Sequence, residues 1–141
     1  MPTGNAVKIC TFRHSIKRSI ANREGNERKV FIPDDCMGMQ IGECLQIISG
    51  GLLVATPHCV KGCKLTPNVA RISLPCFIDT PVTFPLSVPQ GCSREDVFRH
   101  TVAQKVPPLS ERWLRDGIPF ADFLGDSFKS YYAWATSDKS S

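Results

Sequence analysis

The stretch Ala55-Thr56-Pro57-His58-Cys59-Val60, followed by Val69-Ala70-Arg71-Ile72-Ser73, carries most of the fold information in this chain. The apolar and β-branched residues of both runs predict strands, and Pro57 indicates a strand end or a sheet edge. Arg71 and Ser73 are two residues apart, so both side chains leave the same face of a strand. An imidazole can ligate a metal, and a guanidinium with a hydroxyl can grip a carboxylate. The two runs therefore predict half of a site that holds a metal beside an organic acid.

Around these runs, the residues from Lys29 to about Pro85 favour strands and tight turns. Strands are predicted at 30–32, 36–40, 45–49, 52–60 and 69–77. Pro33-Asp34-Asp35 predicts a turn, and residues 61–68 predict a polar loop. The Gly50-Gly51 pair lies between two apolar runs, which predicts a β-hairpin. This half of the chain is expected to be mainly β.

The second half predicts helices. Ser93 with Asp96 three residues on predicts an N-cap and a short helix towards Ala103, and Pro107-Pro108 ends it. A later helix is predicted from an apolar stripe at helical spacing with Pro119 in its first turn: Phe120, Phe123, Leu124, Phe128 and Tyr131. Such a stripe is typical of a helix face that packs on a sheet rather than of a ligand site.

Composition bounds the class of protein. The chain has 141 residues, of which 42% are hydrophobic and 21% charged, as expected for a single globular domain. Its net charge of +4 could favour anionic ligands but does not require nucleic acid, and none is expected as a partner. No apolar run approaches the roughly 20 residues of a membrane helix. Residues 1–5 do not open a secretory signal, so a cytoplasmic protein is expected.

The chain has seven cysteines, an odd number without a tight framework. With no signal peptide expected, they are interpreted as reduced thiols. Cys36, Cys44 and Cys76 lie in apolar runs and are expected to pack as small hydrophobic side chains.

Three motifs follow one another along the chain in the order found in a known protein family. The run Met39-Gln40-Ile41-Gly42-Glu43-Cys44-Leu45-Gln46-Ile47-Ile48-Ser49-Gly50-Gly51 precedes Pro57-His58-Cys59-Val60 and Arg71-Ile72-Ser73. This order resembles the C-terminal half of the isopenicillin N synthase-like iron(II)/2-oxoglutarate-dependent oxygenases. Val106 to Trp113 and the aromatic helix after it are similar to a C-terminal extension found in one branch of that family. The resemblance covers roughly residues 20–134.

The resemblance implies a mainly β protein with C-terminal helices, built as part of a double-stranded β-helix, or jelly roll. It implies that His58 is the distal histidine of a two-histidine, one-carboxylate iron(II) site. It also implies that Arg71 and Ser73 bind the distal carboxylate of 2-oxoglutarate, or a substrate carboxylate in members that lack this cosubstrate. The small-molecule substrate is not identified by any motif.

One departure from the family is serious. Members require an earlier His-x-Asp or His-x-Glu pair, and none of the three histidines, His14, His58 and His100, has a carboxylate two residues later. The chain therefore lacks two of the three iron ligands and is expected to be inactive alone. Its expected organisation is an unassigned segment at 1–20, the C-terminal part of an oxygenase core at 21–90, a helical extension packing on the sheet at 91–135, and a polar tail at 136–141.

Two readings of function follow. The chain is either an incomplete oxidoreductase, truncated or completed by another polypeptide, or a non-catalytic half-barrel that binds a carboxylate ligand or a protein partner. An open sheet would favour association through its uncovered face.

A rival reading takes His58, Cys59 and Cys63 as zinc ligands. Because neighbouring residues on a strand point to opposite faces, His58 and Cys59 would ligate one ion poorly.

Overall fold

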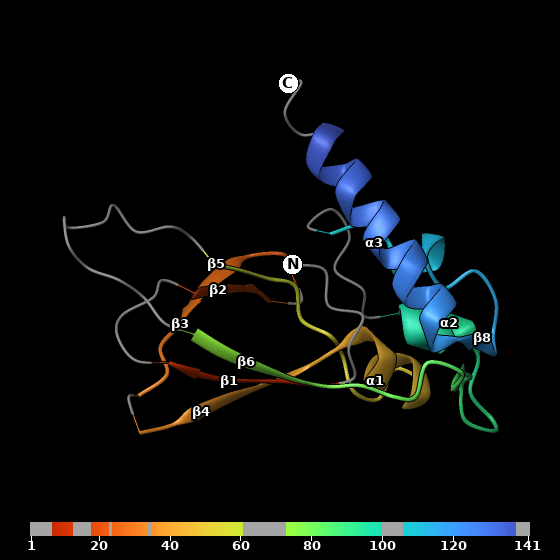
Figure 1. Ribbon diagram of the computed structural model, residues 1–141, viewed down its shortest axis with the longest axis horizontal. Coiled ribbons are helices and arrows are strands. Elements are labelled where there is room, and N and C mark those ends of the chain that lie inside the picture. The colour runs from red at the N-terminus through yellow and green to blue at the C-terminus, as the bar shows by residue number, and fades with distance from the viewer. Residues whose placement is uncertain are drawn as a thin grey trace.

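The computed structural model describes residues 7–12, 18–22, 24–33, 35–60, 73–99 and 106–137. Two three-stranded sheets lie one above the other on one side of the molecule, and the helices gather on the other (Figure 1). A two-stranded sheet of β7 (Pro85–Leu86) and β8 (Ile118–Pro119) lies among the helices. The described part of the protein thus combines small sheets with a long C-terminal helix.

The first sheet has the strand order β4-β1-β6, with β1 (Val7–Phe12) at its centre. Both neighbours, β4 (Met37–Ile41) and β6 (Ser73–Ile78), are antiparallel to β1, and the register sets Ile9 opposite Met39 on one side and Cys76 on the other. The N-terminal residues that carried no predicted element therefore supply a central strand. Their motifs were too few for sequence reasoning to place them.

The second sheet has the order β3-β2-β5 and is also antiparallel. Its strands are β2 (Arg18–Ala21), β3 (Glu27–Val30) and β5 (His58–Val60). The turn from β2 to β3 is closed by Asn22, whose side-chain oxygen accepts from the Asn26 amide at 2.7 Å. Pro57 immediately precedes β5, an edge strand, as predicted from the ring's missing N–H. Of the predicted strand 52–60, only its last three residues are a strand.

The prediction of a hairpin at Gly50-Gly51 is wrong. The run before it forms α1 (Glu43–Ile48), and the glycines end this helix with positive φ angles of 62° and 82°. The Gly51 amide donates to the carbonyl of Gln46 at 2.9 Å, a helix C-cap arrangement. A Gly-Gly pair suits a hairpin and a helix end equally, because both need residues with positive φ. In the folded protein Cys44 and Ile47, three residues apart, are both fully buried, so they lie on the inward face of the helix.

The helices build the main hydrophobic core. A capping box opens α2 (Arg94–Phe98), as predicted, with the Ser93 side chain accepting from the Asp96 amide. A 3₁₀ turn, η1 (Leu109–Glu111), leads towards α3 (Phe120–Ser137). The core joins side chains from α1, α2, β7, η1, β8 and α3: Cys44, Ile47, Leu86, Val97, Leu109, Trp113, Ile118, Phe120 and Phe123. The start of the aromatic stripe thus packs against α1, Trp113 and the small β7–β8 sheet.

The cysteines divide by environment. Cys44 is fully buried, as expected, but Cys36 and Cys76 are exposed, so the prediction that these two pack as core side chains is wrong. Cys76 lies on an outer strand of the first sheet whose outer face carries other exposed apolar residues. Among the described residues, no helix is both long and apolar enough to cross a membrane.

Candidate functional site

His58 is the first residue of β5, and its backbone pairs with Ile20 of β2. The chain before it is fixed from α1: the Gln46 side-chain oxygen accepts from the Ala55 amide at 2.7 Å, and its nitrogen donates to the Val97 carbonyl at 2.8 Å. Because Gln46 is buried, these two bonds satisfy an amide that would otherwise be costly to bury. The helix α1 therefore determines where the strand with His58 begins.

The imidazole of His58 contacts the other sheet. Gln40, on β4, places its side-chain nitrogen Nε2 2.6 Å from His58 Nδ1 and donates from the same nitrogen to the Thr56 carbonyl oxygen at 3.0 Å. These are contacts between the first sheet and the segment that forms the edge of the second. His58 is accordingly half-buried between sheets rather than displayed on a surface.

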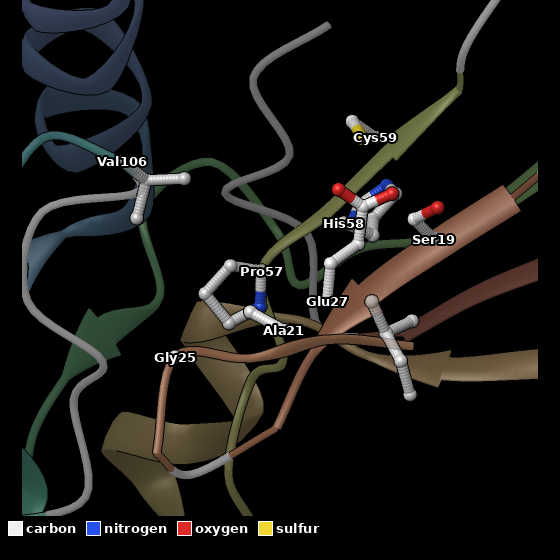
Figure 2. Close-up of a pocket in the computed structure, with 9 residues that line it drawn as sticks. Ser19, Ala21, Gly25, Glu27, Pro57, His58, Cys59 and Val106 are labelled. Carbon is white, nitrogen blue, oxygen red and sulfur yellow. The ribbon is translucent and has the colours of Figure 1, made fainter. Parts of the chain in front are cut away.

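A cleft of about 220 Å³ opens beside the imidazole. It is lined by the strands of the second sheet, the turn after β2 and one residue of the later chain: Ser19, Ile20, Ala21, Gly25, Glu27, Pro57, His58, Cys59 and Val106. Figure 2 shows the carboxylate of Glu27 pointing toward the ring of His58. The cleft thus presents an imidazole and a carboxylate on a largely apolar wall.

The other predicted site residues are placed only in part. Arg71 lies outside the described residues, as does the predicted loop 61–68. Ser73 is described as the first residue of β6, where its backbone pairs with Phe12, but its side chain is not. The structure therefore does not test whether the predicted arginine and serine share a site with His58.

The donor set of the cleft does not match the iron(II) site that the resemblance implies. Within the described parts of the chain, no three His, Cys, Asp or Glu side chains come together as a metal site could require. Cys59, the described partner in the zinc reading, is exposed while His58 is half-buried, and Cys63 lies outside the described residues.

Gln40 was missed by sequence reasoning as a site residue. Its signal was a single polar side chain in the alternating run Met37-Gly38-Met39-Gln40-Ile41, which marks the face opposite to the two methionines. A polar residue on that face needs a partner when a second sheet covers it. The partner, His58, is 18 residues away and could not be read from local spacing.

Comparison with known proteins gives a likeness of fold. No family profile matches the chain, and no curated protein sequence matches it. A solved structure of a protein from Caulobacter crescentus, described as a candidate member of the 2OG-Fe(II) oxygenase family, superposes with a TM-score of 0.63 at 19% sequence identity. The match covers 89% of this chain and 37% of that chain. The chain therefore has a fold like part of that oxygenase-family protein, and spans little more than a third of its length.

Proposed function

We propose that this chain forms the C-terminal part of the barrel of an iron(II)- and 2-oxoglutarate-dependent oxygenase of the isopenicillin N synthase-like type, and that it supplies the carboxylate-binding side of the site. The observation that carries this proposal is the likeness of fold over 89% of the chain, together with a cleft at His58, the residue that the motif order singles out. In this proposal the two three-stranded sheets, which include β1 and β2 as well as strands from the expected core at 21–90, belong to the barrel, and residues 91–135 belong to the extension.

The roles within this proposal are those that the family resemblance implies, and the chemistry of the side chains is compatible with them. Arg71 holds the distal carboxylate of 2-oxoglutarate through two parallel N–H donors, and Ser73 adds a hydroxyl from the same strand face. His58 contributes one imidazole to a metal whose other ligands come from residues outside this chain. Alone, one imidazole does not hold iron(II) against water, so the chain by itself should bind the dicarboxylate and not turn it over.

A second candidate is a non-catalytic half-barrel that binds a carboxylate ligand. The contact between Gln40 and His58 favours it, because that contact already occupies the Nδ1 atom of the imidazole. The two candidates agree on carboxylate binding and differ on whether a completed chain would be an oxygenase.

Calorimetric titration of the purified chain with 2-oxoglutarate tests carboxylate binding. We expect the wild-type chain to bind 2-oxoglutarate measurably. Arg71→Ala should weaken the binding free energy by about 2–5 kcal/mol, as for a charge-assisted contact that loses one partner. Arg115→Ala is the matched control, because Arg115 is exposed and outside the cleft, and it should leave the affinity unchanged. Equal affinities for wild type and Arg71→Ala would refute the role of Arg71.

Oxygenase activity separates the two candidates. The test mixes the chain with iron(II), oxygen and 2-oxoglutarate, with and without a polypeptide carrying the rest of an oxygenase barrel, and measures succinate. Succinate formed only in the completed mixture, and lost with His58→Ala, would support the oxygenase. Binding of 2-oxoglutarate with no succinate in either mixture would favour the non-catalytic half-barrel.

A further inference from the structure

The hydrogen-bond geometry at His58 fixes which ring nitrogen carries the proton. An amide nitrogen can only donate, and Gln40 Nε2 directs one hydrogen to the Thr56 carbonyl oxygen and lies 2.6 Å from His58 Nδ1. Since the Thr56 carbonyl can only accept, it identifies that end of the Gln40 side chain as the nitrogen. His58 Nδ1 must then accept, and a neutral imidazole that accepts at Nδ1 carries its hydrogen at Nε2.

This tautomer leaves the ring without a lone pair for a metal. Nδ1 is engaged by Gln40, and Nε2 bears a hydrogen. A histidine that ligates a metal needs an unshared lone pair on one ring nitrogen, and its other ring nitrogen usually donates its N–H to an acceptor. Glu27, which points toward the ring in Figure 2, is a carboxylate and can only accept, so it also favours an N–H form of the nitrogen that it meets.

We infer that Gln40 is a positioning residue that sets the tautomer of His58. It keeps the imidazole from ligating a metal as long as the Gln40 side-chain amide holds this orientation. Rotating the amide by half a turn would place Gln40 Oε1 against His58 Nδ1. His58 Nδ1 would then carry the hydrogen, and His58 Nε2 would have a lone pair for a metal. The same rotation would set that oxygen against the Thr56 carbonyl, where two acceptors face each other. The amide orientation is therefore held by a bond that does not involve the imidazole.

Nitrogen NMR tests this directly on the intact chain. Long-range ¹H–¹⁵N correlation spectra of imidazoles distinguish the protonated from the unprotonated nitrogen, and the chain has only three histidines to assign. In spectra recorded at a pH where the His58 ring is neutral, wild-type His58 should show a protonated Nε2 and an unprotonated Nδ1. A protonated Nδ1 in wild type would overturn the inference, whatever any variant does.

The variant Gln40→Glu replaces the hydrogen-bond donor beside His58 Nδ1 with an acceptor. Its carboxylate can only accept, so the hydrogen should move to His58 Nδ1 and the ¹⁵N pattern should reverse. Gln90→Glu is the matched control, because it makes the same change at an exposed turn residue, and it should leave the His58 pattern as in wild type. An unreversed pattern would also overturn the inference in a folded Gln40→Glu protein whose side chain at position 40 still gives NOEs to the His58 ring.

The readout needs neither iron nor 2-oxoglutarate, so it is separable from the proposed function. A wild-type result with Nδ1 protonated removes the role of Gln40 and leaves the carboxylate role of Arg71 intact. An Arg71 variant with unchanged affinity for 2-oxoglutarate does the reverse.

Discussion

At the scale of single residues, Arg112 is the most constrained charge among the described residues. Its side chain has no exposed surface, and its two terminal nitrogens donate to the two carboxylate oxygens of Glu43. It also donates to Ser127 and to the Pro107 carbonyl, and its guanidinium lies 5.1 Å from the ring of Tyr131. A buried guanidinium needs this many partners because desolvation opposes its charge.

The neighbours of this ion pair feel the same environment. Burial, reinforced by the Glu43 charge, raises the pKa of Tyr131 to about 12, although Arg112 opposes the shift. Burial followed by the Glu43 charge raises the pKa of the Cys44 thiol. Both side chains are therefore neutral at physiological pH, and Cys44 is a packing residue rather than a nucleophile.

Removing Arg112 should destabilise the protein strongly. Arg112→Met leaves Glu43 without its partner, and breaking a buried pair in this way costs about 3–5 kcal/mol. The lower end is expected, because the Glu43 side chain keeps 13% of its surface exposed and water can partly solvate it. Urea unfolding measures the change, with the exposed Arg115→Met as control, which should shift stability by less than about 0.5 kcal/mol.

A double-mutant cycle with Glu43→Gln decides whether the pair itself matters. The double variant should lose less stability than the two single variants combined, because the second change removes the stranded carboxylate. Additive losses would show that Arg112 acts through Ser127, Pro107 and the aromatic rings and not through Glu43.

At the scale of secondary-structure elements, prediction succeeded where the signal is local. The capping box at Ser93 and Asp96 and the aromatic helix after Pro119 were predicted, because each is specified by residues within one or two turns. α1 was mistaken for a strand because an element of six residues is too short to separate a strand from a helix by spacing. Its neighbours decide the matter: Gly51 has no room for a Cβ, since the Asp96 carbonyl oxygen occupies that place.

The candidate site shows the same division. His58 could be singled out from motifs, but its contact with Gln40 depends on how two sheets face each other, which no short window of sequence encodes. The central position of β1 was likewise not predictable, because pairing with β4 and β6 joins residues far apart in the chain.

The cap of α2 should make stability depend on pH. The backbone amide and hydroxyl of Ser93 donate to the Asp96 carboxylate and, with a smaller contribution from Arg99, lower its pKa. A carboxyl group whose pKa is lowered by folding stabilises the protein above its unfolded pKa, about 3.9, and loses that contribution as pH falls through the folded pKa. Asp96→Asn should therefore destabilise at neutral pH and converge with wild type below about pH 4.

Thermal unfolding of both proteins across this pH range checks the prediction. Asp122→Asn, an exposed carboxylate in the first turn of α3, is the control and should show a smaller pH-dependent difference. A difference between wild type and Asp96→Asn that stayed constant down to acid pH would contradict the assigned role of the carboxylate.

At the scale of the whole molecule, the first sheet has one face that the described residues leave uncovered. Met37 and Met39 on β4 and Ile78 on β6 are 69%, 71% and 49% exposed. Pairing through the central strand β1 sets Met39 and Cys76 in one row and Ile41 and Ile78 in the next, so these residues share a face. The face of a sheet that contacts solvent normally carries polar residues, and an apolar face is typically covered by another layer of the protein.

We expect this uncovered face to bind hydrophobic dye and to promote association of the protein. Met39→Glu places a charge on this face, at the middle residue of the edge strand β4. It should reduce the fluorescence of the dye ANS and the fraction of associated species in sedimentation velocity, with little loss of stability at an exposed position. The control is Leu52→Glu, because Leu52 is 84% exposed and follows α1, away from the sheet. If both variants lowered dye binding equally, the effect would come from added charge in general, and the face would have no special role. A fall confined to Met39→Glu would show that the uncovered face of the first sheet drives association.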